Sequence, residues 1–173
     1  NSAYAPYLIQ QEIPYPHEVG IFYCRQPDQP HGKITGIVLK KNVEVQGDGK
    51  LTVKELIDAV PRYYFQRNFL YTAYRSQLNN VIPNGEKMVL LEVGNHARGA
   101  EFRDITHKNN AALEKLIDTI SMQYNTFYFG RYDIKFHNWE DLCEGKNFMI
   151  VELNGSGSEP THIYDPSKRI WNA

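Results

Sequence analysis

The chain has 173 residues and a net charge of −1, with 19 lysines and arginines against 20 aspartates and glutamates. This balance argues against the basic surface of a nucleic-acid-binding protein, and no apolar run is long enough to cross a membrane. The length fits one domain or a large part of one. Because no signal-peptide pattern is present, we expect a cytoplasmic protein without nucleic-acid or membrane partners.

Two features bear on the state of the chain. Cys24 and Cys143 lie far apart and belong to no CxxC pair, so we expect two free thiols in a reducing compartment, with a single disulfide as the alternative. The chain opens on Asn1 without an initiator methionine and soon enters an apolar stretch. This start leads us to expect that the chain is a fragment of a longer protein. The simpler alternative is that a tag or the initiator methionine was removed.

The first half of the chain predicts strands followed by helices. Strands are expected over residues 7–13, 18–24 and 33–39, which are apolar stretches separated by turn clusters rich in proline and glycine. The first two would form a hairpin with a longer loop. Thr52, with Glu55 three residues later, has the pattern of a capping box that opens a helix over residues 53–59. Pro61 ends or restarts this helix, and residues 62–78 have the pattern of an aromatic-rich amphipathic helix.

The second half predicts a strand over residues 86–93 and then a long polar loop over residues 94–106. Apolar residues spaced i, i+3, i+4 and i+7 predict a helix over residues 111–122. Two further apolar runs, at residues 127–136 and 148–154, predict the last two strands, joined by a polar excursion. Since consecutive strands with short connections are usually antiparallel, this order predicts an α+β fold with a mostly antiparallel sheet and packed helices.

The last two apolar runs each carry isolated polar side chains. Asp133 interrupts the first run, and Glu152 and Asn154 lie two residues apart in the second, on one face of a strand. A carboxylate in an otherwise buried strand is costly unless a positive group meets it. If the two runs are neighbouring strands, these oxygens converge and suit Mg²⁺ better than zinc. The alternative is an ordinary carboxylate and a turn asparagine at a strand end.

The order of these motifs resembles the C-terminal lobe of the ATP-grasp ligases, the superfamily of D-alanine–D-alanine ligase. Members carry Arg-x-Asp on one strand, Glu-x-Asn on the next, and a Ser/Thr-His pair after the following loop. The corresponding residues are Arg131 with Asp133, Glu152 with Asn154, and Thr161 with His162. Residues 45–57 are similar to a segment of cyanophycin-synthetase-like members. The resemblance implies that residues 1–173 form the C-terminal lobe, and the family's upstream lobe with its Gly-rich phosphate loop has no counterpart in them.

The resemblance also implies roles for single residues. Asp133, Glu152 and Asn154 would hold Mg²⁺. Arg131 would stabilise charge on the transferred phosphoryl group and on the tetrahedral intermediate. The family loop usually contains a Pro-Gly pair that is missing here, and the backbone N–H of Ser158 would take over the role of oxyanion donor. A surface ion pair between Arg131 and Asp133 is the alternative for those two residues.

The hinge of the family implies the nucleotide contacts. In that hinge one residue reads the adenine amino group, and a glutamate seven positions later holds the ribose. Gln11 and Glu18 have this spacing (18 − 11 = 7), and Glu12 and Ile13 lie beside the adenine position. The alternative is that these are ordinary polar residues of a hairpin.

The activity implied by the resemblance is that of an ATP-dependent carboxylate–amine ligase. ATP would convert a carboxylate to an acylphosphate, and an amine would then attack it to form an amide bond. Ile163 stands where D-alanine ligases carry a serine that holds the acceptor, which argues against D-alanine. Lys40 and Lys41, at the end of a strand, are expected to be solvated, with contact to a phosphate as the alternative.

The expected partners are therefore ATP, Mg²⁺ and small carboxylate and amine substrates, with a homodimer left open. The isolated chain is expected to be inactive because the resemblance places half of the nucleotide site upstream. The alternative function is a non-catalytic nucleotide- or metabolite-binding module of the same fold.

Overall fold

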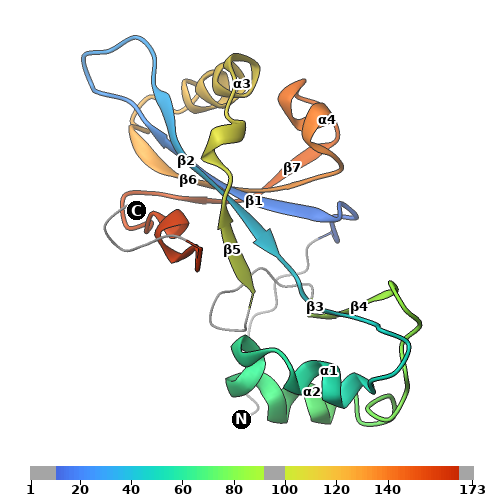
Figure 1. The fold of residues 1–173 in the computed structure, drawn as a ribbon. Coiled ribbons are helices and arrows are strands. Elements are labelled where there is room, and N and C mark those ends of the chain that lie inside the picture. The colour runs from blue at the N-terminus through green and yellow to red at the C-terminus, as the bar shows by residue number, and fades with distance from the viewer. Residues whose placement is uncertain (1–10, 92–99, 168–173) are drawn as a thin grey trace, which may run out of the picture.

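The computed structural model describes residues 11–91 and 100–167. It contains a five-stranded sheet in the order β5-β2-β1-β6-β7 and a two-stranded sheet of β3 and β4. Every strand pair in both sheets is antiparallel, so the predicted α+β class with a mostly antiparallel sheet is confirmed (Figure 1).

The strands are β1 (His17–Cys24), β2 (Lys33–Lys41), β3 (Val43–Gln46), β4 (Lys87–Leu91), β5 (Glu101–Asp104), β6 (Phe129–Phe136) and β7 (Phe148–Asn154). The helices are α1 (Val53–Asp58), α2 (Arg67–Ala73), α3 (Ala111–Ser121) and α4 (Trp139–Cys143). Short 3₁₀ helices span Pro61–Gln66, Thr106–Lys108 and Thr161–Tyr164.

Helices α3 and α4 cover one face of the large sheet (Figure 1). Alternate residues of β1, β2 and β6 point toward these helices and form the main core with residues of α3. The strands contribute Val19, Ile21, Tyr23, Ile37, Tyr132 and Ile134, and α3 contributes Leu113 and Ile117. Asn110 and Asn138 cap the two helices by accepting hydrogen bonds from backbone N–H groups. Because strand residues alternate, the intervening side chains of β1 and β6 point to the face that α3 and α4 leave open.

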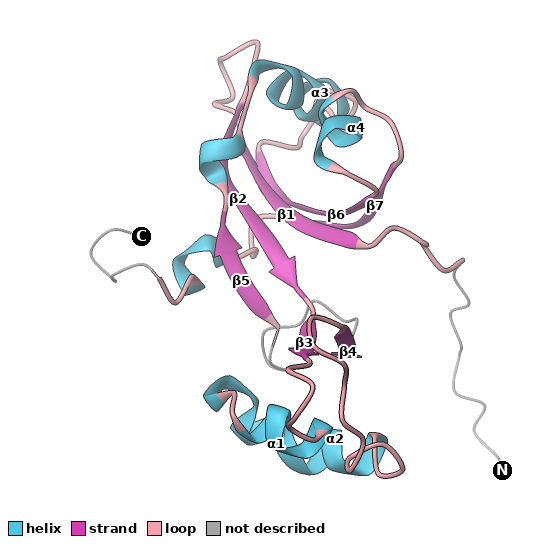
Figure 2. Cartoon of the chain, turned by 45° about the vertical axis from the view of Figure 1, so that its right-hand side comes forward, coloured by secondary structure: helices cyan, strands magenta, loops and turns pink. Residues whose placement is uncertain are grey.

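A second, smaller unit packs α1 and α2 against β3 and β4, as Figure 2 shows. Its core consists mainly of Val43, Val45, Val53, Ile57, Tyr63, Leu70 and Leu90. Strand β2 leads almost directly into β3, so this unit continues from one strand of the large sheet. The predicted capping box is confirmed, since the Thr52 side chain accepts from the Glu55 N–H and the Glu55 carboxylate accepts from the Thr52 N–H.

Three short elements lie where loops were expected or no element was foreseen. Strand β5 falls in the expected polar loop, and it forms because the edge of β2 supplies its hydrogen bonds, while Phe102 alone anchors it by deep burial. Residues 94–99 of that loop lie outside the described residues. Helix α4 buries only Leu142, and β3 buries only its two valines. Both elements are therefore too short for their apolar residues to show a helical or strand periodicity in the sequence.

Two predicted elements differ from the structure. The helix expected over residues 62–78 is wrong in its extent, because a 3₁₀ helix starts at Pro61 and α2 ends at Ala73. Only Tyr63 and Leu70 are deeply buried there, so no continuous apolar face holds a longer helix. Residues 11–13 form no strand, so the strand and hairpin predicted from residues 7–13 are not found in the described part, and residues 7–10 lie outside it.

Strand β7 is an exposed edge strand, and the prediction of a buried strand there is wrong. Among the described strands it pairs only with β6, and Met149, Val151 and Leu153 are all exposed. An apolar run does not by itself distinguish a buried strand from one at a sheet edge. Glu152 therefore lies in solvent, and its charge carries no large desolvation cost.

Two further expectations concern the chain as a whole. Cys24 and Cys143 are free thiols, as predicted. Across residues 11–91 and 100–167, no helix is both long and apolar enough to span a membrane.

Candidate functional site

Strands β6 and β7 bring four of the predicted site residues together. The two strands are neighbours, and their register places Asp133 opposite Glu152 and Arg131 opposite Asn154. All four side chains lie on the face of the sheet that α3 and α4 do not cover, because the neighbouring core residues of β6 point to those helices.

The amide of Asn154 lies between the two carboxylates. One end of the amide is 3.3 Å from Asp133 Oδ2 and 3.3 Å from Arg131 Nη2, and the other end is 3.0 Å from Glu152 Oε1. With its oxygen toward Arg131 and its nitrogen toward Glu152, the amide accepts from the guanidinium and donates to the carboxylate. The three predicted metal ligands are therefore adjacent side chains.

Arg131 and Asp133 form a bidentate ion pair on this face. Arg131 Nε donates to Asp133 Oδ1 at 2.9 Å, and Nη2 donates to Oδ2 at 3.0 Å. The guanidinium also lies 5.8 Å from the centre of the Phe22 ring. Gly20 faces Asp133 across the strand pair, and a Cβ there would lie 3.1 Å from Arg131 Cδ and 3.3 Å from Asp133 Oδ1. The ion pair thus depends on a glycine beneath it.

Lys40 belongs to the same group of charges, and the expectation that its side chain is solvated is wrong. Its Nζ lies 2.6 Å from Glu18 Oε1 and 3.2 Å from Asp133 Oδ1. The signal that would have identified it is strand pairing: β1 and β2 are antiparallel, and Lys40 stands opposite Glu18. We call Glu18, Lys40, Arg131, Asp133 and Glu152 the charged cluster.

A pocket of about 310 Å³ adjoins the charged cluster. It is lined by residues 12–18 together with Asn42, Val89 and Lys135. Three predicted nucleotide-binding residues, Glu12, Ile13 and Glu18, are part of this lining, whereas Gln11 is exposed and is not.

A second pocket of about 260 Å³ shares Pro16, His17 and Asn42 with the first. It is lined also by Lys40, Lys41 and Lys87, and by Glu44, whose carboxylate lies 2.7 Å from Lys87 Nζ. The two pockets adjoin each other, and each includes one member of the charged cluster, Glu18 in the first and Lys40 in the second.

The loop after β7 carries polar atoms without partners. The Ser158 N–H, predicted as an oxyanion donor, donates to Gly155 O at 2.9 Å within a turn. In the part of the chain that the structure describes, Ser158 Oγ, Thr161 Oγ1 and His162 Nδ1 are buried without a hydrogen-bond partner. The His162 ring lies edge-on to Phe22 at 5.8 Å, so this loop folds back toward the same face of the sheet.

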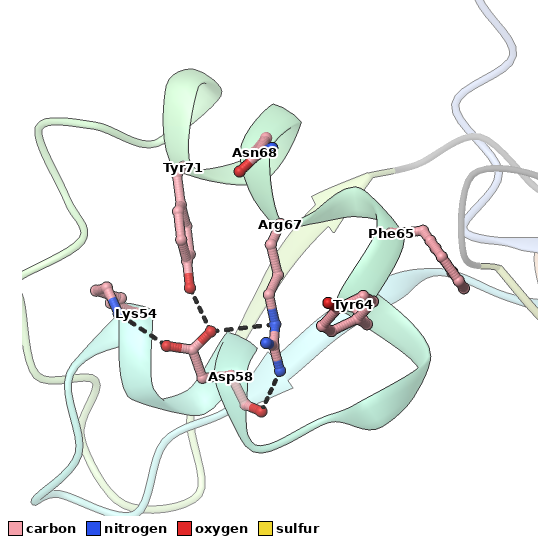
Figure 3. Close-up of a pocket in the computed structure, with 7 residues that line it drawn as sticks. All are labelled: Lys54, Asp58, Tyr64, Phe65, Arg67, Asn68 and Tyr71. Carbon is pink, nitrogen blue, oxygen red and sulfur yellow. Dashed lines mark hydrogen bonds and ion pairs between the residues drawn. The ribbon is translucent and has the colours of Figure 1, made fainter.

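A pocket of about 550 Å³ lies in the smaller unit, away from the predicted residues (Figure 3). Lys54, Arg67 and Tyr71 converge there on the Asp58 carboxylate: Lys54 Nζ lies at 2.8 Å and Arg67 Nε at 3.2 Å, and the Tyr71 hydroxyl donates a hydrogen bond. These hydrogen bonds, first that of Lys54 and then that of Tyr71, lower the pKa of Asp58. Because both cations are already paired, we interpret this cluster as a structural link between α1 and α2.

The predicted ligands fit Mg²⁺ by their chemistry. Asp133, Glu152 and Asn154 provide only carboxylate and amide oxygens, which is the ligand type that Mg²⁺ prefers, and they lie side by side on two strands. Residues 11–91 and 100–167 contain no cluster of three or more histidine, cysteine, aspartate or glutamate side chains suited to a metal. The Asp–Glu–Asn set stays a prediction.

The fold is similar to the ATP-grasp fold. One similar solved structure is a bifunctional glutathione synthetase from Pasteurella multocida, with a TM-score of 0.60 and 13% sequence identity. The match covers 87% of this chain and 22% of that chain. At this identity the similarity concerns the fold alone. No family model and no curated protein matches the sequence.

Proposed function

We propose that this chain is the C-terminal lobe of an ATP-dependent carboxylate–amine ligase that requires Mg²⁺. In this proposal the chain supplies the metal-binding and acceptor side of the site. The observation that carries it is the convergence of Asp133, Glu152 and Asn154 with Arg131 on the open face of the sheet. The similarity to an ATP-grasp fold supports the proposal at the level of architecture.

The nucleotide would lie along the two adjoining pockets. Its base would enter the pocket of residues 12–18, with Glu18 toward the ribose, and its phosphates would extend toward the charged cluster. Mg²⁺, held by Asp133, Glu152 and Asn154, would neutralise and orient the phosphates. Phosphoryl transfer depends on this positioning and charge neutralisation more than on covalent help from the protein.

Arg131 would act on the reacting groups. The substrate carboxylate attacks the γ-phosphorus of ATP and ADP leaves, and the amine then attacks the acylphosphate and releases phosphate as the amide bond forms. Both steps build negative charge on oxygen. A guanidinium that Asp133 holds by two hydrogen bonds is suited to stabilise it. Ser158 would contribute its unpartnered hydroxyl, or its N–H once released from Gly155.

The same proposal includes a cytoplasmic location, where ATP is available, and small carboxylates and amines as substrates. The two substrates are left as chemical classes. The experiment that tests the function is a screen for ADP release by the full-length protein that carries this chain, with Mg²⁺·ATP and pairs of amino acids and other carboxylates. We expect ADP release that requires both members of one pair, and no turnover by residues 1–173 alone.

The second candidate is a non-catalytic nucleotide- or metabolite-binding module. It is favoured by the engagement of the Ser158 N–H in a turn. Nucleotide binding to the full-length protein without ADP release from any pair would support this module and count against the ligase.

A further inference from the structure

Lys40 lies between two carboxylates to which the proposed function gives different roles. Glu18, at 2.6 Å from Lys40 Nζ, is on the nucleotide side, and Asp133, at 3.2 Å, is on the metal side. The side chains of Lys40 and Asp133 are only 7% and 5% exposed. A charge removed from water in this way is stable only while its partners stay in place, so Lys40 and the two carboxylates form one coupled unit.

The oxygens of Asp133 are already engaged. Oδ1 accepts from Arg131 Nε at 2.9 Å and meets Lys40 Nζ at 3.2 Å, and Oδ2 accepts from Arg131 Nη2 at 3.0 Å and lies 3.3 Å from the amide of Asn154. A carboxylate has about four lone-pair positions. Three of these positions are used when the Asn154 nitrogen faces Glu152, so a cation that binds Asp133 has to come close to both of the cations that the protein itself supplies.

The charges around Asp133 also disfavour a metal ion that binds without nucleotide. Two cations, Lys40 and Arg131, stand against the carboxylates of Glu18, Asp133 and Glu152. A third cation, Lys135, stands opposite Glu18 in the strand register and lines the same pocket, so these six side chains together have no net charge. A divalent ion alone would add two uncompensated positive charges beside the poorly hydrated Lys40 and Asp133, which is unfavourable. A divalent ion bound to a triphosphate brings net negative charge instead. The phosphate oxygens also offer Lys40 and Arg131 new acceptors.

We propose that Lys40 is a positioning residue that makes metal binding dependent on nucleotide. In the absence of nucleotide it is the internal counter-ion that holds Glu18 and Asp133 together and competes with Mg²⁺ for Asp133. When the phosphates arrive, Lys40 turns to them and Asp133 becomes available to the metal. This inference rests on the proposed function, because it takes Asp133 as a metal ligand and Glu18 as a nucleotide contact.

The test is a calorimetric titration of Mg²⁺ alone into the full-length protein, comparing the wild type with Lys40→Met. Without the competing ammonium, Lys40→Met is expected to bind the metal about tenfold more tightly, or better, in the absence of nucleotide. Lys33→Met is the matched control, since Lys33 is an exposed lysine at the other end of β2 and lines neither of the two pockets. Its metal affinity is expected to equal that of the wild type.

A second variant and a second titration keep the result interpretable. Lys40→Gln retains a hydrogen-bond donor for Glu18 without the charge, so it is expected to show the same gain in metal affinity. It replaces Lys40→Met in the comparison if thermal melting shows that Lys40→Met folds poorly. The titrations are repeated with a non-hydrolysable ATP analogue. The analogue is expected to raise the metal affinity of the wild type strongly and that of the Lys40 variants much less.

The outcomes separate the inference from the proposed function. If nucleotide raises the metal affinity of the wild type but neither Lys40 variant gains affinity for the metal alone, the inference is overturned and the proposed function stands. The same holds if the wild type binds the metal equally well with and without nucleotide. If no variant binds the metal under either condition, the proposed function is overturned and the inference with it.

Discussion

Arg131 and Asp133, two positions apart on β6, share a bidentate ion pair in which Nε–Oδ1 measures 2.9 Å and Nη2–Oδ2 measures 3.0 Å. Side chains at i and i+2 of any strand share a face, but two matched hydrogen bonds also require a planar donor. Gly20 leaves the room for this pair, and Phe22 supports the guanidinium from one side. An ammonium group cannot reproduce that geometry.

Arg131→Lys therefore tests whether the geometry of the guanidinium matters for activity. The variant keeps the positive charge but loses the two parallel N–H donors of the guanidinium. We therefore expect kcat for ADP release to fall about 10²–10³-fold, as for the loss of one oxyanion donor. The KM for ATP should change much less, since the role is assigned to the transition state. Steady-state kinetics measure both. Arg75→Lys, at an exposed position, is the control and should leave kcat unchanged. An unchanged kcat in Arg131→Lys would show that Arg131 has no catalytic role.

Glu152→Gln tests the metal assignment. The side chain lies on an exposed edge strand, with Oε1 3.0 Å from one end of the Asn154 amide. A neutral amide is a much weaker ligand for Mg²⁺, so Mg²⁺·ATP-dependent ADP release should fall by about a hundredfold or more. Because Glu152 is not buried, the thermal midpoint should stay the same.

The control for that variant is Glu144→Gln, which alters an exposed glutamate paired with Lys146 at the surface. Both variants are assayed for ADP release and for thermal unfolding. Wild-type turnover in Glu152→Gln, over a range of Mg²⁺ concentrations, would be incompatible with Glu152 as a ligand.

Much of the fold follows from local sequence signals. The capping box at Thr52 and Glu55 depends on residues three apart, and helix α3 shows its apolar stripe within a few turns, so both are visible in the sequence. The adjacency of β6 and β7, on which the expected convergence of Asp133, Glu152 and Asn154 depends, is also found, and two consecutive strands with a limited connection usually pair.

The remainder depends on contacts between distant residues. The environment of Lys40 is set by Asp133, on a strand that comes much later in the chain, and no local pattern distinguishes it from the exposed Lys41. Strand β5 exists because β2 offers it an edge. The apolar residues of β7 are exposed because nothing pairs with its outer side in the described sheet. Each of these facts is a property of the assembled sheet, which single-sequence patterns do not contain.

Gly20→Ala tests the close packing beneath the ion pair. The new Cβ would lie 2.9 Å from Val38 Cγ1 and 3.1 Å from Arg131 Cδ, so the strand or the guanidinium must shift. We expect a loss of about 1–3 kcal/mol in the free energy of unfolding, typical of overpacking, and a fall in ADP release. Urea denaturation and kinetics measure the two effects. Gly157→Ala, which meets no atom within 4 Å, should leave the stability unchanged, and an equal effect in both variants would rule out the packing argument.

Asp58→Ala tests the structural role of the cluster in Figure 3. The substitution leaves Lys54, Arg67 and Tyr71 without their shared acceptor. Because the site is partly exposed and screened by water, we expect the free energy of unfolding to fall by only about 1 kcal/mol. Nucleotide-dependent activity should be retained at permissive temperature. Asn68→Ala, in the same pocket, is the control, and a loss of nucleotide binding without any loss of stability in Asp58→Ala would show that this pocket has a functional role instead.

Asp118, on α3, anchors the β1–β2 turn to the helical layer. Its carboxylate accepts from the Tyr23 hydroxyl at 2.6 Å and from the Gly32 N–H at 2.9 Å, and it lies 2.8 Å from His31 Nδ1. Burial opposes the charge of Asp118, but these hydrogen bonds outweigh it and hold the pKa of the carboxyl below its usual value. Burial, together with the bond to Asp118, raises the pKa of Tyr23, so the phenol stays protonated as a donor.

The lowered pKa of Asp118 sets the sign of a pH dependence. A carboxyl whose pKa is lower in the folded state contributes stability above its unfolded value, near 3.9, and loses it as the pH falls through the folded value. Asp118→Asn should therefore be less stable than the wild type by about 1–3 kcal/mol at pH 7, and the difference should shrink at pH values below about 4. Urea denaturation at pH 7, 5 and 3 measures it, with Asp28→Asn, exposed in the same turn, as the control. A difference that stays constant down to pH 3 would mean that the shape of the Asp118 side chain, and not its charge, holds the turn.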